Sequence, residues 1–415
     1  MDASIRAALA FYILFIVVFL AGVSTGQNSF DNSVLILRYE MFYVFCSILL
    51  VGFPSIADYF SRHRVTSILL VLFVLSIIAS AIYSPYSVLD KKRGMERFLV
   101  TLGHLVFFVF VFDLFSRFKL PRGRIFWAVI AANLWIAVIF VFTWFSPLGK
   151  EWDWYGDPPF NAHIRLTGYQ AATALAALGA CYLVAVNSTF KHMGFGLLLL
   201  GSWLFVVWLD GRMAVIASLL VILALCVFMF LHKRLKLWHV MVILGTFSIA
   251  MFCYLQLEFN YKMEQRGNAL TRFSRADPSA SRFELWLFTL EAWKQEPWFG
   301  YGSQGFLYIP GKRRGPVQPH GMFFQFLIEW GLVGSLLFCG LVLRGLWAGF
   351  KAHCAKFAMS DYSVLVPLAV MVVLGVHGLT DGTFYHAQPS FYFVLALGVW
   401  AAGTPADEED TKTSL

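Results

Sequence analysis

The sequence predicts an all-α polytopic membrane protein of about twelve transmembrane helices, with one large extracytoplasmic loop between the ninth and tenth. Of its 415 residues, 59% are hydrophobic and only 13% are charged, whereas a soluble domain carries roughly 25% charged residues. Apolar stretches close to the roughly 20 residues that cross the hydrocarbon recur from end to end. Because backbone groups in lipid must be satisfied within their own segment, such stretches form helices.

Each expected span is an apolar run between charged or turn-rich breaks. In the first half the runs cover residues 7–25, 38–54, 65–83, 97–115, 124–145 and 167–187. In the second half they cover 193–209, 213–231, 238–257, 321–349, 362–380 and 388–403. The chain then divides into helices 1–9 (1–257), a loop with short helices (258–319), helices 10–12 (320–403) and an acidic tail (404–415).

Lys and Arg in the short loops predict the orientation, because they are retained preferentially on the cytoplasmic side. With the N-terminus inside, the cytoplasmic turns contain Arg62, Arg64, Lys119, Arg122, Arg124, Lys191, Lys233, Arg234, Lys236, Lys351 and Lys356. The loop with Lys91, Lys92 and Arg93 departs from this pattern. Both termini are therefore expected in the cytoplasm, and the long loop on the opposite side.

A secondary transporter is the alternative class, since twelve spans with both termini inside are common among transporters. Such proteins usually consist of two related halves around a site at the bilayer midplane. No similarity between halves is visible here, and the one long loop falls late in the chain. Both observations argue against a transporter.

The long loop carries more cationic than anionic side chains. Its Lys and Arg residues are Lys262, Arg266, Arg272, Arg275, Arg282, Lys294, Lys312, Arg313 and Arg314. A phosphate-bearing ligand explains this excess, because Arg presents a planar fork of donors that matches phosphate oxygens; the alternative is ordinary solvated charge. The net charge of +8 is spread over membrane-flanking turns and this loop, so no nucleic-acid partner is expected.

A helix is expected within the loop, over residues 278–295. Asp277-Pro278 resembles an N-cap followed by Pro at the first helical position, and Ser281 with Glu284 has capping-box spacing. The spacing of four large apolar residues predicts that they share one face of this helix. They are Phe283, Trp286, Leu290 and Trp293.

Two arginines at the outer ends of spans are further candidates. Arg212 follows Asp210-Gly211 in a very short turn between two apolar runs, where an ionisable group is a functional candidate by default. The alternative is a structural latch in which Arg212 pairs only with Asp210. Arg165 begins the span that continues through Gly168 and is interpreted in the same way.

No metal or cofactor is expected. Glu151 and Asp153 have the general form of a divalent-cation site, but Trp154, Tyr155 and the adjacent prolines are equally typical of an aromatic interface belt. We find no phosphate-binding loop or dinucleotide fingerprint.

Residues 319–334 resemble the signature of the O-antigen ligase and O-antigen polymerase superfamily, in which a His begins a helix and Glu, Gly and Gly follow. The matching residues are His320, Glu329, Gly331 and Gly334, with Gly321 where the family often has Asn. Asp210-Gly211-Arg212 is similar to the family's Gly-Arg turn, and Arg282 through Trp286, Pro297, Gly300, Gly302 and Phe306 are similar to a second segment. The resemblance covers roughly residues 160–390.

This resemblance implies a GT-C-like glycosyltransferase of the bacterial inner membrane, acting at the periplasmic face. It would move a glycan from an undecaprenyl-diphosphate carrier to an acceptor: a sugar of lipid A-core for a ligase in lipopolysaccharide biosynthesis, another carrier-linked unit for a polymerase. The ligase is favoured, because one compact periplasmic loop bears the Arg, Gly-x-Gly and His motifs together.

The resemblance and the chemistry together assign candidate roles. His320 is the expected general base, since imidazole suits proton acceptance near neutral pH; the alternative is a helix-start residue that satisfies backbone donors. The expected diphosphate ligands are Arg212 and Arg282 first, then Arg165, Arg266, Arg275, Lys312, Arg313 and Arg314. Asp381, Tyr385 and His386 are expected on the acceptor side, and His377 and His386 compete with His320 for the role of base.

Overall fold

The protein is an assembly of helices. The computed structural model describes residues 2–24, 29–54, 64–150, 154, 158–159, 163–185, 189–209, 211–256, 282–311, 317–358 and 363–402. Every regular element within these ranges is an α-helix or a short 3₁₀ helix.

The helices in the first half are α1 (Ala3–Val23), α2 (Ser29–Val51), α4 (Arg64–Tyr83), α5 (Lys92–Arg117), α6 (Trp127–Phe145), α7 (Ile164–Ala185), α8 (Thr189–Trp208), α9 (Arg212–Leu231) and α10 (Leu237–Gln256). Those in the second half are α12 (Arg282–Trp293), α13 (Met322–Ala358), α14 (Leu365–Gly378) and α15 (Ala387–Ala401). The 3₁₀ helices are η1 (Val88–Asp90), η2 (Arg122–Phe126), η3 (Pro147–Lys150), η5 (Gly305–Tyr308) and η6 (Thr383–Tyr385). Each of the twelve predicted spans overlaps one α-helix, and α12 lies within the predicted loop helix. The predicted all-α polytopic fold is confirmed.

Three of the twelve helices differ from ordinary membrane spans. Among the described residues, nine helices are long and apolar enough to cross a membrane. α14 and α15 are apolar but shorter. The remaining helix, α7, is buried at every residue from Leu166 to Leu183, and it is rich in Ala, whose small side chain lets helices approach closely. Because protein covers α7 on all sides, it does not require a lipid-compatible surface.

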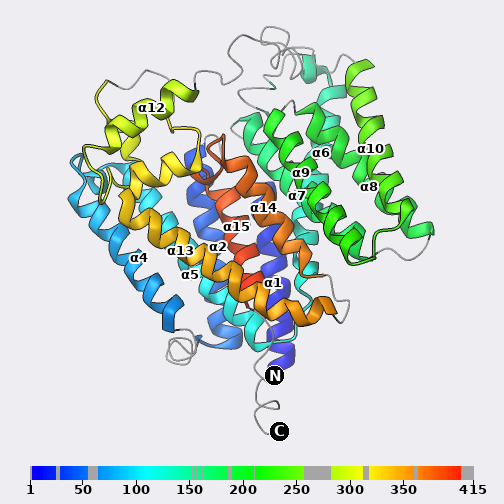
Figure 1. The fold of residues 1–415 in the computed structure, drawn as a ribbon, viewed down its shortest axis with the longest axis horizontal. Coiled ribbons are helices and arrows are strands. Elements are labelled where there is room, and N and C mark those ends of the chain that lie inside the picture. The colour runs from blue at the N-terminus through cyan, green and yellow to red at the C-terminus, as the bar shows by residue number, and fades with distance from the viewer. Residues whose placement is uncertain are drawn as a thin grey trace.

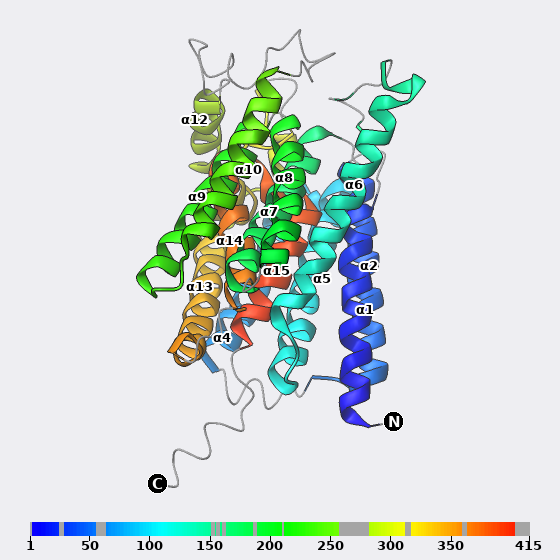
Figure 2. The same cartoon turned by 90° about the vertical axis from the view of Figure 1, so that its right-hand side faces the viewer.

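The helices α7, α14 and α15 form the interior of the bundle (Figures 1 and 2). α14 packs against α7, α9 and α15, and α15 packs against α5 and α13. A buried amide joins three helices, because Gln388 of α15 donates to the Ala21 carbonyl of α1 at 2.8 Å and to the side-chain oxygen of Gln170 of α7 at 3.2 Å. α12 lies at one end of the bundle, and α1 begins and α15 ends at the other end (Figure 1).

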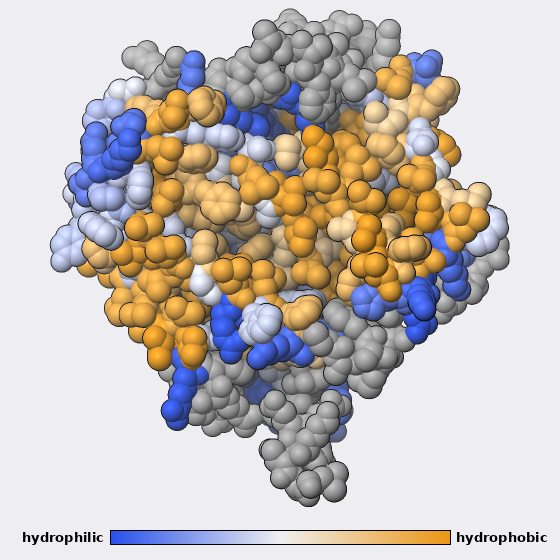
Figure 3. All heavy atoms as spheres, viewed as in Figure 1, coloured by the Kyte–Doolittle hydropathy of each residue, from blue (hydrophilic) through white to orange (hydrophobic). Residues whose placement is uncertain are grey.

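The outer surface of the bundle is apolar. Figure 3 shows a broad band of hydrophobic side chains between two hydrophilic rims. Large apolar residues of the band are exposed, among them Leu75 of α4 and Leu336 and Leu343 of α13. Such a continuous exposed apolar surface matches the hydrocarbon of a bilayer. The protein is therefore a multi-pass membrane protein.

One predicted span is broken. The sequence predicted a single span over residues 321–349, but α13 is interrupted at Gly331, whose φ of 64° and ψ of −169° are not helical. The backbone groups around the kink bond to the segment after α12: Leu332 N–H donates to the Pro297 carbonyl at 2.8 Å, and Gly302 N–H donates to the Glu329 carbonyl at 3.0 Å. A Cβ on Gly331 would overlap the Trp298 carbonyl group. The glycine is thus required both by its backbone angles and by the segment docked against it.

Candidate functional site

Four of the predicted site residues meet at the end of the bundle that carries α12. Arg282 is the first residue of α12, His320 precedes α13 by two residues, Arg165 is the second residue of α7, and Asp381 lies between α14 and η6. The four residues span more than 200 positions of the sequence, from Arg165 to Asp381. Only the folded bundle brings them together.

His320 is held in an unusual backbone conformation. Its φ is 53°, in the left-handed region that a residue with a side chain seldom occupies and that recurs at functional sites. The Trp286 indole of α12 donates to the Pro319 carbonyl at 3.0 Å and to the His320 carbonyl at 3.3 Å, and it stacks on Phe324 with ring centroids 5.0 Å apart. A Cβ on Gly321 would lie 3.2 Å from the indole nitrogen, so glycine at this position leaves room for Trp286.

Asp381 is the partner of His320. Its Oδ1 accepts hydrogen bonds from His320 Nδ1 at 3.0 Å and from the backbone N–H of Gly382 at 2.9 Å. Arg282 Nη2 lies 3.9 Å from Oδ2. The Asp381 side chain is 7% exposed, whereas those of His320 and Arg282 are each 20% exposed. The carboxylate therefore forms the floor of the site, and the histidine and arginine lie above it.

Asp381 is ionised. Burial raises the pKa of its carboxyl, but the hydrogen bond from His320 and the positive charges of Arg165 and Arg282 lower it by more, so the pKa lies well below its ordinary value. An ionised carboxylate only accepts hydrogen bonds. Nδ1 of His320 is therefore the protonated ring nitrogen.

Further aromatic and imidazole rings pack beneath this group. Tyr169 of α7 contacts the rings of His377 and His386, with centroids 4.7 Å and 5.7 Å apart, and His377 Nδ1 lies 3.4 Å from the Thr383 hydroxyl. Burial lowers the pKa of His386 to about 3. His386 is therefore a neutral imidazole at neutral pH and contributes no positive charge.

The geometry supports proton transfer at His320. With Nδ1 donating to Asp381, Nε2 is the ring nitrogen left to accept a proton, and the carboxylate stabilises the imidazolium that results. A carboxylate that fixes the tautomer and orientation of a histidine in this way is a recurrent arrangement. Arg282 and Arg165 add positive charge on the same side, where an anion can bind.

The other predicted site residues are Arg212, Tyr385, His386 and five residues of the loop. Arg212 begins α9 at the same end of the bundle and is half-buried, so its place in an anion site stays a prediction. Tyr385 is buried and its hydroxyl donates to the side-chain oxygen of Gln304 at 2.9 Å, and His386 is largely enclosed. The other predicted ligands lie outside the described residues: Arg266, Arg275, Lys312, Arg313 and Arg314.

The four apolar residues of the predicted loop-helix face differ in their burial. Phe283 is 62% exposed, whereas Trp286 stacks on Phe324 and Trp293 packs against a small separate core that contains Ala292, Tyr301 and Phe306. Leu285 and Phe288 of α12 pack against the same core. The packed side of α12 therefore includes residues outside the predicted stripe, because helical spacing alone does not show which residues meet the bundle.

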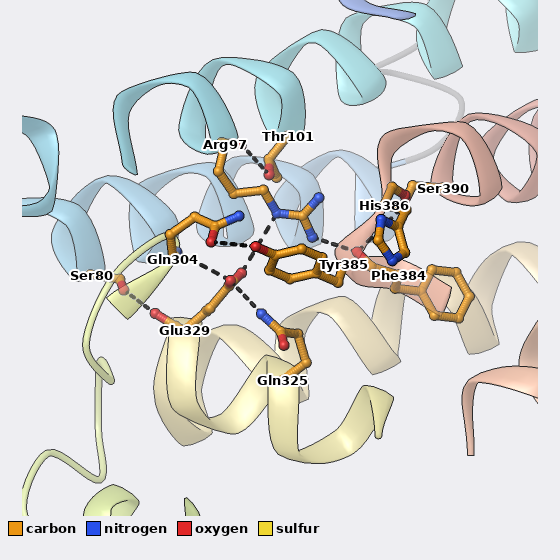
Figure 4. Close-up of polar contacts among 10 residues, drawn as sticks. All are labelled: Ser80, Arg97, Thr101, Gln304, Gln325, Glu329, Phe384, Tyr385, His386 and Ser390. Atoms are coloured by element: carbon orange, nitrogen blue, oxygen red, sulfur yellow. Dashed lines mark hydrogen bonds and ion pairs between the residues drawn. The ribbon is translucent and has the colours of Figure 1, made fainter. Parts of the chain in front are cut away.

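Sequence reasoning missed a second polar group, which lies deeper than His320 and is drawn in Figure 4. Glu329 of α13 is fully buried, and Arg97 of α5 lies beside it with Nε 3.8 Å from Oε2. Gln304 and Gln325 also contact the Glu329 carboxylate. Glu329 was known from the motif without a role, and Arg97 was placed at the start of an apolar span. The available signal was that both are ionisable residues within hydrophobic segments.

The absence of a metal site stays a prediction. Within the described ranges, no group of three His, Cys, Asp or Glu side chains is arranged to hold a metal ion. Glu151 and Asp153, the alternative metal ligands, lie outside these ranges.

The fold and the site define a class: a multi-pass helical membrane protein with a histidine–carboxylate pair and arginines at one end of the bundle. Residues 195–339 match the family model described as O-antigen ligase. This stretch runs from α8 into α13 and contains α12 and His320. This part of the chain is therefore similar to the O-antigen ligase superfamily, and the resemblance found in the sequence is confirmed at that level.

One relative aligns with most of the chain. An uncharacterized protein of Haemophilus influenzae (strain ATCC 51907 / DSM 11121 / KW20 / Rd) is 21% identical over 326 residues, which cover 74% of this chain and 77% of the relative. The aligned length exceeds the family match, so the similarity extends beyond the motif region.

Proposed function

We propose that this chain is an O-antigen ligase that transfers a glycan from undecaprenyl diphosphate to a sugar of lipid A-core without a metal ion. The observation that carries the proposal is the His320–Asp381 pair with Arg282 beside it, in a chain whose residues 195–339 match the O-antigen ligase family. A base next to an anion-binding arginine is what attack on a sugar diphosphate requires.

The proposed reaction uses the His320–Asp381 pair as its base. His320 Nε2 takes the proton of the acceptor hydroxyl as its oxygen bonds to the anomeric carbon of the glycan. The bond from that carbon to the diphosphate oxygen breaks, and the lipid diphosphate leaves with the electron pair. A single displacement of this kind inverts the configuration at the anomeric carbon. Asp381 holds the imidazole in place and stabilises its positive charge.

Arginine stabilises the leaving group in this proposal. Arg282 Nη2 lies 3.9 Å from Asp381, beyond hydrogen-bond length, so its guanidinium binds a phosphate oxygen without first breaking a hydrogen bond to the carboxylate. Arg165 is exposed at the start of α7. We assign the same role to Arg212 and to the loop residues Arg266, Arg275, Lys312, Arg313 and Arg314. Charge that develops on the diphosphate is thereby neutralised.

The proposal places the enzyme in the bacterial inner membrane with its site facing the periplasm and both termini in the cytoplasm. Lys191, Lys233, Arg234 and Lys236 lie near the ends of α8, α9 and α10 that are remote from α12 (Figure 2). Positive charge at that end supports this orientation. The loop 258–319 is then periplasmic, and the tail 404–415 is cytoplasmic.

An O-antigen polymerase is the second candidate, since the superfamily match accommodates it and the same base and arginines serve both reactions. The two differ only in the acceptor, which for the polymerase is a second carrier-linked glycan. A secondary transporter is less well supported, because its substrate and ion sites typically lie near the bilayer midplane, whereas the His320–Asp381 pair lies at one end of the bundle.

Reconstitution tests the function. Purified protein in liposomes receives undecaprenyl-diphosphate glycan and lipid A-core, with EDTA and without nucleotide, and wild type is compared with His320→Ala and with the matched control His232→Ala at the opposite end. We expect ligated product from wild type and the control only. Lengthened carrier-linked glycan would identify the polymerase instead. No product from wild type would refute both, and full activity of His320→Ala would refute the base.

A further inference from the structure

Segments far apart in the sequence meet at one buried carboxylate, Glu329 (Figure 4). Its Oε1 accepts hydrogen bonds from the Gln325 side-chain amide and, at 3.1 Å, from the backbone N–H of Gln304. Arg97 Nε lies 3.8 Å from Oε2, and the two side chains are 7% and 0% exposed. Removing one charge of a buried pair leaves the other uncompensated, which is strongly unfavourable. Arg97 and Glu329 therefore depend on each other.

The same group holds the turn η6. Arg97 Nη2 donates to the Phe384 carbonyl at 2.5 Å, so one guanidinium joins α5, α13 and η6. The Tyr385 hydroxyl donates to the Gln304 side-chain oxygen at 2.9 Å. Figure 4 shows Tyr385 between Gln304 and the Phe384 carbonyl. Two adjacent residues of the turn are thus attached to the Glu329 group.

The turn and the helix carry the two halves of the site. η6 begins two residues after Asp381, and α13 begins two residues after His320. α13 is fixed at Glu329 from a third side, because Ser80 Oγ of α4 donates to the Glu329 carbonyl at 2.6 Å. The Arg97–Glu329 pair therefore connects the segment that carries the base with the segment that carries its carboxylate.

We propose that Arg97 and Glu329 are positioning residues for the transfer reaction: their buried ion pair holds η6 against α13 and so keeps Asp381 in hydrogen-bond contact with His320. The inference rests on the proposed function of His320 and deepens it. Neither residue touches the reacting atoms, and Tyr385 belongs to this support and not to the acceptor site. A misplacement of about 1 Å at a reacting group lowers a rate about 100-fold.

The first test separates turnover from binding. Glu329→Gln keeps the shape of the side chain and removes its charge, and Glu291→Gln is the matched control on α12, where the side chain is 70% exposed. We expect Glu329→Gln to lower kcat about 10- to 100-fold with the KM for the donor changed less than about twofold, and Glu291→Gln to match wild type. An unchanged kcat of folded Glu329→Gln would overturn the proposal, as would a loss confined to KM.

Milder variants keep the proposal testable if Glu329→Gln does not fold. Tyr385→Phe removes only the hydroxyl that attaches η6 to Gln304, and Arg97→Lys keeps the charge but loses the fork that reaches both Glu329 and Phe384. Both should lower kcat severalfold while the melting temperature in detergent stays close to that of wild type. Wild-type kcat in both would overturn the proposal.

A readout without glycan transfer separates this inference from the proposed function. The rate at which diethyl pyrocarbonate modifies His320, followed by mass spectrometry, reports its contact with Asp381, and exposed His232 is the internal reference. We expect Glu329→Gln or Tyr385→Phe to shift the His320 rate in the same direction as Asp381→Asn. An unshifted rate overturns the positioning role. A shifted rate in a protein that transfers no glycan supports it and refutes only the proposed reaction.

Discussion

Asp381→Asn tests whether the carboxylate orients the base. The substitution keeps the size of the side chain but removes its charge, so the 3.0 Å contact with His320 Nδ1 is no longer charge-assisted. A hydrogen bond to a charged group contributes about 1.5–3 kcal/mol, and each 1.36 kcal/mol is a factor of ten in rate. We therefore expect kcat for ligation to fall about 10- to 150-fold.

Folding should survive this change, because the Arg282 side chain is 20% exposed and water solvates its guanidinium when the carboxylate is absent. Initial rates are measured from the gel shift of lipid A-core, with the amount of folded protein matched by size exclusion. Asp113→Asn is the control, since Asp113 pairs with Arg117 at the far end of α5. A kcat of Asp381→Asn within twofold of wild type would refute the orienting role of the carboxylate.

Three further outcomes are expected. Arg282→Lys and Arg212→Lys should each lower kcat/KM for the donor about tenfold, since a point charge does not replace a planar fork; wild-type kinetics in either would remove that residue from the diphosphate site. Gly331→Ala should lower the melting temperature or the yield, because its φ of 64° is strained for a side chain, whereas Gly340→Ala, where the nearest atom is 3.8 Å away, should not. Burial lowers the pKa of His386 from 6.5 to about 3, so between these pH values the unfolded chain binds a proton that the folded chain does not, and stability present above pH 6.5 is lost on acidification. Between pH 7.5 and 5.0 the melting temperature of wild type should therefore fall about 2–4 °C more than that of His386→Gln. Parallel plots of melting temperature against pH would contradict this.

Most of the fold follows from the sequence because its dominant interaction is local. A run of apolar residues long enough to cross the bilayer is visible without knowledge of its neighbours, and all twelve predicted spans are helices. The break in α13 was not predictable from the same pattern, since Gly331 is one of several glycines in a largely apolar run. Its cause is the segment Pro297–Gly302, whose backbone bonds to the kink. That contact depends on the tertiary fold.

The site was predictable where the type of a residue and its motif indicate its chemical role. His320 and Arg282 stand in motifs beside the cationic loop, and the structure brings them together with Asp381. The partnership of His320 with Asp381 could not be predicted, because 61 residues separate them and nothing in the sequence specifies the contact. Arg97 was missed for a related reason: its role depends on its contact with Glu329, which lies on another helix.

The full enclosure of α7 has a consequence for how the bundle is assembled. Gln170 is a buried polar residue of this helix, and its side-chain oxygen accepts a hydrogen bond from Gln388 of α15. α7 also packs against α14, which begins only at Leu365 and, like α15, is synthesised long after α7. Lipid supplies no donor that replaces Gln388. The C-terminal helices therefore complete the interior last, and a chain that stops before Leu365 leaves its central helix uncovered in the membrane.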